Sequence, residues 1–331
     1  MPKFLVIQTA FTGDVVLATA LVEKLHRFFP KAQIDILVRK GNEGLFTDHP
    51  FIQGVLIWNK KEHKNRNLFK LLGEIRKNRY DKVVNLQRFA STGLLTAFSG
   101  AAEKIGFDKN PFSRFFTKRV GHDFSAGKHE VDRNDLLVRD FTDDQPGKPR
   151  LYPSEKNLAE IAPLTGVPYV CIMPASVWFT KQYPEDHWVD FIHRLPDQYT
   201  TYLLGGREDR ALCERIRLES GGKKVKVLAG DLGFLSSVAL MQKAAMNYSN
   251  DSAPLHFASA TDAPVTAIFC STIPGFGFYP LSTRSFIVET REQLSCRPCS
   301  LHGMKACPEQ HFKCGRTILT EQLLETLPAT S

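Results

Sequence analysis

The sequence predicts an α/β protein with two doubly wound domains, each built around a parallel sheet that helices cover on both faces. Three observations predict this fold. Short apolar runs of strand length alternate with amphipathic segments of helix length from the first residues onward. Residues 140–154, rich in Asp, Pro and Gly, interrupt the alternation, which then begins again. No sequence repeat of solenoid period is present, which excludes a repeat array.

The alternation predicts individual elements in both halves. In the first half the expected strands are 4–8, 33–38, 55–58 and 82–86, and the expected helices are 15–29 and 67–77. In the second half the expected strands are 169–173, 200–204, 225–228, 246–249 and 265–269, and the expected helices are 184–195, 208–219, 234–243, 253–260 and 317–327. We therefore predict one domain in 1–155, a second in 156–316, and a C-terminal helix within 317–331 that packs back on the first domain.

Positive charge is concentrated in the first half of the chain. The formal net charge is +8, and residues 60–119 hold 15 basic and 5 acidic side chains. Such a surface attracts nucleic acid, an acidic membrane or a phosphorylated substrate; the alternative is an ordinary solvated surface. Because no recognition motif for nucleic acid is present, we expect no nucleic-acid partner.

The sequence predicts a cytoplasmic protein. No run of about 18 apolar residues, the length that spans a bilayer, is present. Residues 4–7 and 18–20 are similar to parts of a signal peptide, but Gly13 and Asp14 interrupt the apolar core that such a peptide needs.

Parallel sheets bind ligands beyond the carboxyl ends of their strands, so the turns between strands and helices are the places to look for chemistry. The first turn contains Thr12, Gly13 and Asp14. Asp14 has two alternative roles, a helix cap or a general base that takes a proton from an acceptor hydroxyl. The turn lacks G-x-G-x-x-G, which disfavours a dinucleotide oxidoreductase.

A second turn, from Pro174 to Pro184, contains Ser176 and Lys181 just ahead of an expected helix. Helix N-termini bind phosphate through their backbone N–H groups, and a lysine there adds a full positive charge. The alternative is a solvated surface lysine. In either case we expect that replacing Lys181 by alanine leaves thermal stability nearly unchanged.

Two further turns of the second half have polar groups suited to a nucleotide. Gly205 and Gly206 allow close backbone approach, and Glu208 is an acid that can bind ribose hydroxyls; a tight turn before a charged helix start is the alternative. The last turn offers polar groups for a diphosphate and a ribose, with a capped helix and a hydrogen-bonded histidine as the alternative; these groups are Asp251, Ser252 and His256.

Four of the seven cysteines lie close together near the C-terminus, namely Cys296, Cys299, Cys307 and Cys314. Four thiolates complete a closed tetrahedral zinc site, and in a reducing cytoplasm such clustering favours metal over disulfides. We predict a structural zinc ion, with a set of reduced thiols as the alternative.

Taken together, the four turns resemble those of glycosyltransferase family nine, the heptosyltransferases, over nearly the whole chain. The motifs that match follow one another in the family's order: Gly13-Asp14-Val15-Val16-Leu17, Pro174-Ala175-Ser176, Lys181-Gln182-Tyr183-Pro184, Gly205 to Asp209, Asn250-Asp251-Ser252 with His256, and Cys296-Arg297-Pro298-Cys299. One position departs from the pattern, since Ala253 stands where the family has glycine. Its side chain would narrow the approach to the diphosphate.

The resemblance implies a GT-B fold, in which two Rossmann-like domains face an interdomain cleft. It implies an inverting glycosyltransferase that moves a heptose from ADP-heptose to an anionic lipopolysaccharide inner-core acceptor. Asp14 would be the base, and Lys181 would stabilise the departing ADP together with helix N-termini, so that no cofactor is required for catalysis. The substrate contacts that it implies are Thr12, Gly13, Ser176, Glu208, Asp251, Ser252 and His256.

Such an acceptor implies peripheral contact with the cytoplasmic face of the inner membrane. Three alternative functions share the fold: transfer from another nucleotide sugar, epimerisation of a sugar nucleotide, and glycolipid binding without catalysis. Ala253 leaves the last alternative open, whereas Asp14 and Lys181 argue against it.

Overall fold

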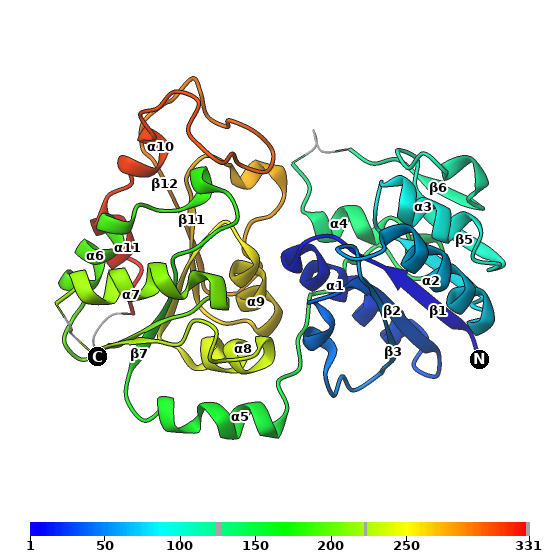
Figure 1. Ribbon diagram of the computed structural model, residues 1–331, viewed down its shortest axis with the longest axis horizontal. Helices are drawn as coiled ribbons and strands as arrows, with labels where there is room; N and C mark the ends of the chain where they lie inside the picture. Colours follow the sequence, from blue (N-terminus) through cyan, green and yellow to red (C-terminus); the bar gives the residue numbers. More distant parts are fainter. Residues whose placement is uncertain (124–126, 222–223, 329–331) are drawn as a thin grey trace. The chain divides into compact units, whose positions relative to one another are not determined.

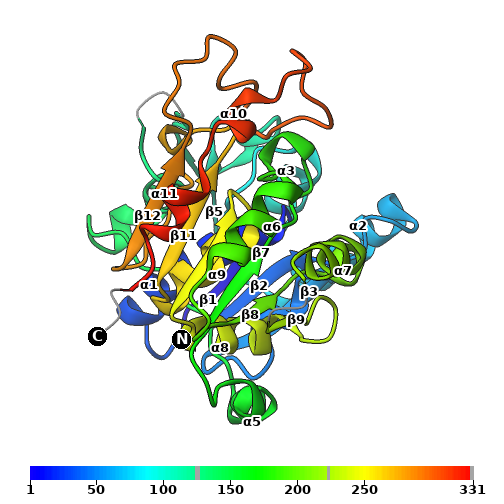
Figure 2. The ribbon, with the colours of Figure 1, turned by 90° about the vertical axis from the view of Figure 1, so that its left-hand side faces the viewer.

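The computed structural model describes residues 1–123, 127–221 and 224–328. The chain divides into two compact units, unit 1 from Met1 to Tyr152 and unit 2 from Pro153 onward. The division falls within the segment rich in Asp, Pro and Gly. The ribbons in Figures 1 and 2 show that helices lie against both faces of the sheet in each unit.

Unit 1 is a six-stranded parallel sheet with two pairs of helices. Its strands are β1 (Lys3–Ile7), β2 (Gln33–Arg39), β3 (Ile52–Trp58), β4 (Lys82–Asn85), β5 (Glu103–Phe107) and β6 (Lys118–Val120). Its helices are α1 (Thr12–Phe28), α2 (Lys64–Asn78), α3 (Ala90–Ala97) and α4 (Glu130–Asp135). Helices α1 and α4 pack together, as do α2 and α3. The apolar side chains of α2 and α3 share one core with β1 and β4.

Unit 2 repeats this architecture. Its strands are β7 (Tyr169–Met173), β8 (Thr200–Leu203), β9 (Val225–Val227), β10 (Met246–Asn250), β11 (Val265–Phe269) and β12 (Ser285–Glu289), all parallel. Its helices are α5 (Glu155–Ile161), α6 (Glu185–Arg194), α7 (Arg210–Glu219), α8 (Phe234–Lys243), α9 (Ala253–Thr261), α10 (Lys313–Arg316) and α11 (Thr320–Leu324). Central strands β7, β10 and β11 are buried along their whole length, as expected of strands that helices cover on both faces.

Both sheets have the same doubly wound topology. The strand order is β3-β2-β1-β4-β5-β6 in unit 1 and β12-β11-β10-β7-β8-β9 in unit 2. Counted within each unit, both orders are 3-2-1-4-5-6 or its reverse. In this topology ligands bind where the winding changes direction, beyond the carboxyl ends of the first and fourth strands. Those points are β1 and β4 in unit 1, and β7 and β10 in unit 2. The predicted fold class, two Rossmann-like doubly wound domains, is confirmed.

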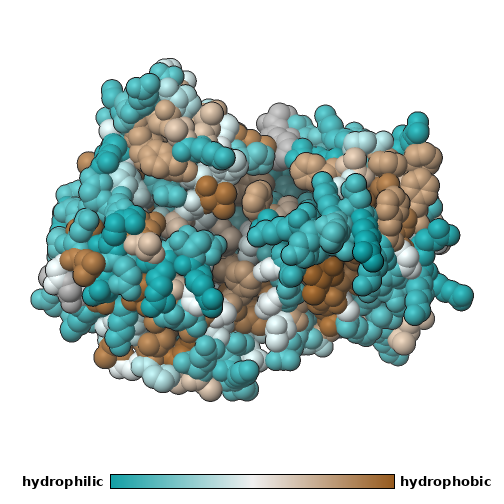
Figure 3. Space-filling model, viewed as in Figure 1, coloured by the Kyte–Doolittle hydropathy of each residue, from teal (hydrophilic) through white to brown (hydrophobic). Residues whose placement is uncertain are grey.

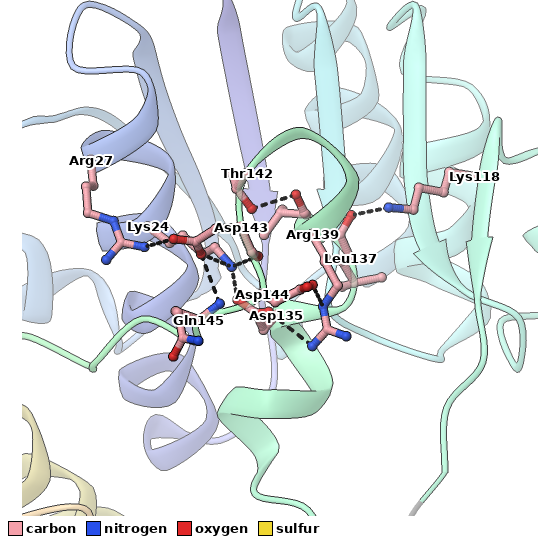
Figure 4. A network of polar contacts seen from close by, with 11 residues as sticks. Lys24, Arg27, Lys118, Asp135, Leu137, Arg139, Thr142, Asp143, Asp144 and Gln145 are labelled. Atoms are coloured by element: carbon pink, nitrogen blue, oxygen red, sulfur yellow. Dashed lines mark hydrogen bonds and ion pairs between the residues drawn. The ribbon is translucent and has the colours of Figure 1, made fainter.

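A buried polar network anchors α1, the helix whose first turn contains the candidate base. Lys24 is 1% exposed, and its Nζ pairs with the Asp135 carboxylate of α4 and donates to the Asp143 carbonyl oxygen at 2.6 Å (Figure 4). Figure 4 also shows Arg27 reaching the Asp143 carboxylate, at 2.9 Å, from the same helix. The network ties α1 to the segment that ends unit 1, and therefore fixes the helix whose first turn contains Asp14.

The C-terminal helix packs within unit 2, which corrects one prediction. We expected a helix in 317–331 that packs back on the first domain, but α11 packs against α6. Leu323 joins the apolar core of unit 2, and the Tyr183 hydroxyl donates to the Ile318 carbonyl oxygen at 3.3 Å. The leucines of this short helix join the core cluster that contains residues of α6 and β10, and the amphipathic pattern could not show which unit they pack in.

Within the described residues, no helix combines the length and the apolar character needed to cross a bilayer.

Candidate functional site

The first candidate site lies at the switch point of unit 1, where α1 begins. The N-cap residue of α1 is Phe11, and Asp14 is the third residue of the helix, so Asp14 is not its N-cap residue. Asp14 is half-buried, and its negative charge acts on both Arg39 and Arg88. Thr12 donates from Oγ1 to Asn42 Oδ1 at 2.9 Å, which ties this turn to the loop after β2.

Basic side chains follow the neighbouring strands at the same edge of the sheet. Arg39 ends β2, Lys60 follows β3 and Arg88 follows β4. Burial, and after it the charges of Arg39 and Lys64, lower the pKa of Lys60 to about 8. The Lys60 ammonium also donates to the Thr9 carbonyl oxygen at 2.6 Å, so it lies beside the β1–α1 turn. This edge therefore concentrates positive charge in a half-buried place, which suits an anionic ligand.

A buried carboxylate lies near the same edge. The pKa of Glu130 is raised to about 6, because burial and the charge of Asp14 outweigh the lowering effect of Arg133. Arg133 donates from Nε to Glu130 Oε2 at 2.9 Å. Both residues belong to α4, which packs on α1. Sequence reasoning missed this pair, because neither residue follows a strand directly.

The second candidate site lies at the switch point of unit 2 and centres on an ion pair. Lys181 follows β7 and Asp251 follows β10; Lys181 Nζ lies 2.7 Å from Asp251 Oδ2. The two side chains are only 14% and 10% exposed, so Lys181 is not the solvated surface lysine of the alternative interpretation. Thr272, after β11, donates from Oγ1 to the same Oδ2 at 2.7 Å. The structure thus joins two predicted residues and adds a third that the sequence did not indicate.

Asn250 fixes the two turns relative to one another. Its side chain is fully buried; Oδ1 accepts from the Tyr183 backbone N–H at 2.9 Å, and Nδ2 donates to the Pro174 carbonyl oxygen at 2.8 Å. In the motif Asn250-Asp251, the asparagine therefore holds the loop after β7, and the aspartate faces Lys181.

The aliphatic part of the Lys181 side chain packs against the segment that contains the four C-terminal cysteines. An added Cβ at Gly303, whose φ is +84°, would lie 2.8 Å from Lys181 Cγ and 3.0 Å from Trp178 Cβ. Buried Thr180 joins this segment to the turn, since its N–H donates to the Met304 carbonyl oxygen at 3.1 Å and its Oγ1 accepts from the Met304 N–H at 2.8 Å. No local motif marks Thr180 or Gly303, because their partners lie more than a hundred residues away in the chain.

The other predicted contacts lie around this centre at differing depths. Ser176 is half-buried in the turn after β7, and its carbonyl oxygen accepts from Gln182 Nε2 at 2.7 Å. Ser252 is the N-cap residue of α9, but its hydroxyl bonds to the Asn250 carbonyl oxygen at 3.3 Å and not to the helix backbone. His256 is buried one turn inside α9. Glu208 is exposed in the turn after β8, one strand away from the switch point.

The four cysteines lie in one segment, residues 296–314, here called the cysteine segment. All four are free thiols, and Cys314 is buried. Burial, together with the charges of Cys299, Cys307 and Cys296, raises the pKa of Cys314 to about 12. Among the described residues, no three His, Cys, Asp or Glu side chains are arranged to hold a metal ion. The structural zinc ion stays a prediction.

Arg297 anchors the cysteine segment to the end of β11. Its Nε donates to the Cys270 carbonyl oxygen at 2.6 Å, and its Nη2 to the Thr272 carbonyl oxygen at 2.8 Å. The Cys299 N–H donates to the Ser271 carbonyl oxygen at 3.2 Å. The segment therefore lies beside Thr272, which bonds Asp251.

Comparisons with known proteins point to one family. The family model of glycosyltransferase family 9 (heptosyltransferase) matches residues 68–308. Lipopolysaccharide heptosyltransferase 3 of Escherichia coli is 28% identical over 280 residues, which cover 79% of this chain and 82% of the relative. Lipopolysaccharide heptosyltransferase 1 of Pseudomonas aeruginosa is 26% identical over 317 residues, covering 90% and 86%. The solved structure of E. coli ADP-heptose lps heptosyltransferase II has the same fold, with a TM-score of 0.80 at 21% identity and coverage of 98% and 97%.

Proposed function

The chain belongs to glycosyltransferase family 9, the heptosyltransferase family, and we propose that it moves a heptose from ADP-heptose to an inner-core lipopolysaccharide acceptor with inversion. It is a transferase of lipopolysaccharide biosynthesis, as its heptosyltransferase relatives are. One relative of the same fold is an ADP-heptose heptosyltransferase by name, which supports ADP-heptose as the donor. The observation on which the proposal most depends is the pair of Lys181 and Asp251 at the switch point of unit 2.

The donor would bind in unit 2, with its diphosphate against Lys181. An ammonium group has three N–H donors. If the ion pair with Asp251 occupies one of them, the others can donate to phosphate oxygens. Lys181 and Thr272 both bond Asp251 Oδ2. Among the described residues, no hydrogen bond reaches Asp251 Oδ1, so this oxygen is placed to accept one from a sugar hydroxyl.

The acceptor would bind at the basic edge of unit 1, beside Asp14. Arg39, Lys60 and Arg88 give that edge the positive charge that an acidic or phosphorylated inner-core sugar requires. The acceptor oxygen would attack the anomeric carbon and form the new glycosidic bond as the bond to ADP breaks. Asp14 would take the hydroxyl proton, and the electron pair of the broken bond would leave with ADP, whose charge Lys181 stabilises.

The inner-core acceptor is attached to lipid, so we propose that the protein works at the cytoplasmic face of the inner membrane. The positive charge of residues 60–119 favours contact with the anionic lipids there. This association would be peripheral and would weaken as salt rises.

The experiment combines ADP-heptose with a panel of lipopolysaccharide core acceptors and identifies products by mass spectrometry. Asp14→Asn should keep donor binding and lower turnover by roughly 10²–10⁴-fold. Glu74→Gln, which alters an exposed carboxylate on α2, is the matched control and should transfer as the wild type does. A donor converted to an epimer without acceptor, or equal turnover in Asp14→Asn, would overturn the proposed mechanism.

A further inference from the structure

Three phenylalanine rings form a cluster on the surface of unit 1. Phe98 is the C-cap residue of α3, Phe112 is the N-cap residue of the 3₁₀ turn η2 (Ser113–Phe115), and Phe115 is the last residue of that turn. Their ring centroids are 6.3 Å apart for Phe98 and Phe112, 5.9 Å for Phe98 and Phe115, and 6.3 Å for Phe112 and Phe115. Phe98 is 47% exposed and Phe115 is 43% exposed. The rings therefore pack on one another while much of their area faces outward.

The fold holds these rings outward by specific contacts. The next residue, Phe116, is buried against Gly106, where an added Cβ would lie 2.6 Å from its ring. Buried Asn110 donates from Nδ2 to the carbonyl oxygens of Gln87 and Phe89, both at 3.1 Å, and its Oδ1 accepts from the Phe112 N–H at 2.9 Å. The loop is thus fixed to the turn after β4, and its exposed rings are a stable feature of the surface.

Basic residues are frequent in the segment that carries two of these rings. The Arg114 guanidinium lies 4.7 Å from the centre of the Phe115 ring. Residues 104–119 hold five Lys or Arg and one acidic residue, Asp108. In Figure 3, apolar side chains gather among hydrophilic ones over the region that Figure 1 labels α3 and β6. Exposed aromatic rings within a basic surface have the composition of a surface that binds the interface of an anionic bilayer.

The cluster also adjoins the proposed acceptor edge. Phe89, 63% exposed, begins the turn into α3, and Asn110 bonds its carbonyl oxygen. The residue before it, Arg88, lies close enough to Asp14 for the two charges to interact. We call Phe89, Phe98, Phe112 and Phe115 the aromatic surface. It begins one residue beyond the edge at which a lipid-linked sugar would be held.

We propose that the aromatic surface inserts into the headgroup region of an anionic phospholipid leaflet and so brings the lipid-linked acceptor to Asp14. This inference rests on the proposed glycolipid acceptor. It adds a short-range apolar anchor to the long-range attraction between residues 60–119 and anionic lipid. Charge brings the protein to the leaflet, and the rings hold it there because their exposed area leaves water. The anchor also sets the orientation, since the rings and Arg88 lie on adjoining turns.

The test measures partition of the full chain onto vesicles of phosphatidylglycerol and phosphatidylethanolamine. The double variant Phe98→Ser/Phe115→Ser should lower the partition coefficient by about 10–30-fold, because each half-exposed ring loses its transfer into the leaflet. Leu218→Ser removes a side chain that is 66% exposed on α7 of unit 2, and this control should bind as the wild type does. The variant Phe115→Trp should keep binding, and brominated lipid should quench its added fluorescence. A melting curve checks that each variant is folded.

Two outcomes would overturn the inference. One is equal partition of the double variant and the wild type. The other is that the wild type sediments as a dimer and the double variant as a monomer, with no difference in vesicle binding. The aromatic surface would then be an interface between two copies of the chain. Transfer to a lipid-free core oligosaccharide separates this inference from the proposed function. The double variant should retain transfer to this soluble acceptor. If the wild type itself transfers no heptose, the proposed function fails, but the vesicle measurement still tests whether the rings bind lipid.

Discussion

Replacing Lys181 by alanine should destabilise unit 2 as well as slow transfer, because the lysine has a buried partner. This differs from the expectation from sequence, in which stability stays nearly unchanged. Lys181 Nζ lies 2.7 Å from Asp251 Oδ2, and the side chains are 14% and 10% exposed. Removing one partner of a fully buried pair costs about 3–5 kcal/mol, because the other charge stays buried alone. Residual exposure and the bond from Thr272 reduce the cost here, and we expect about 2–3 kcal/mol.

The assay is scanning calorimetry combined with titration of ADP. For a unit of this size, 1 kcal/mol shifts the melting midpoint by about 2–4 °C, so Lys181→Ala should lower that of unit 2 by about 5–10 °C. Lys181→Met keeps the length of the side chain and should behave similarly. The double variant Lys181→Met/Asp251→Asn removes both charges and should recover much of the stability, since no buried charge is left unpaired. Transfer and ADP affinity should stay low in all three variants.

Two results would refute this reasoning. A Lys181→Ala protein whose midpoint stays within about 1 °C of the wild type would mean that the buried pair does not form in solution. ADP affinity equal to that of the wild type would mean that Lys181 does not contact the diphosphate, whatever its effect on stability.

Three further predictions follow from named contacts. An anionic acceptor binds the charged form of Lys60, whose pKa is about 8 in the protein without ligand, so acceptor affinity should fall as the pH rises through about 8. Lys60→Arg should remove this inflection of the affinity profile, because arginine stays charged; an unchanged profile in the variant would exclude Lys60 from the acceptor site. Gly303→Ala should raise the Kd for ADP and slow transfer, because its Cβ would displace Lys181, whereas Gly275→Ala, whose nearest contact is 3.6 Å away, should not; equal effects of the two would refute the packing argument. Elemental analysis of protein purified without chelator should find about one zinc per chain if the cysteine segment holds four thiolate ligands, and metal-free protein that is folded and active would defeat that prediction.

The parts of the fold that the sequence predicted are those with strong apolar patterns. Strands 169–173 and 265–269 were predicted at both ends, because they are buried on both faces and so are apolar throughout. The strands that sequence reasoning missed include β6 and β12, which lie at the edges of their sheets. An edge strand pairs on one side only and is partly exposed, so its residues need not be apolar; β6 is Lys-Arg-Val. Helix α3 was also missed, because Gly93 and its threonines interrupt the apolar pattern.

The residues of the candidate sites were also predicted only in part from the sequence. Asp14, Lys181 and Asp251 were indicated by their places after strands, since the topology gathers such turns at one edge of a sheet. Their partners were not indicated. Thr272 and Gly303 meet the lysine and its aspartate through contacts between distant parts of the chain, and no local spacing predicts such a contact.

The contacts around Lys181 indicate how one lysine can serve a diphosphate and still be held in place. Asp251 compensates its charge, and an ammonium group has three N–H donors, so the ion pair leaves donors that the proposed diphosphate could use. Gly303 packs against the aliphatic part of the side chain, and Thr272 holds the aspartate. Both residues depend on the cysteine segment, since Gly303 belongs to it and Arg297 bonds the Thr272 carbonyl oxygen. A change in the state of the four thiols would therefore act on transfer through the position of the lysine, without any contact between a metal ion and the substrate.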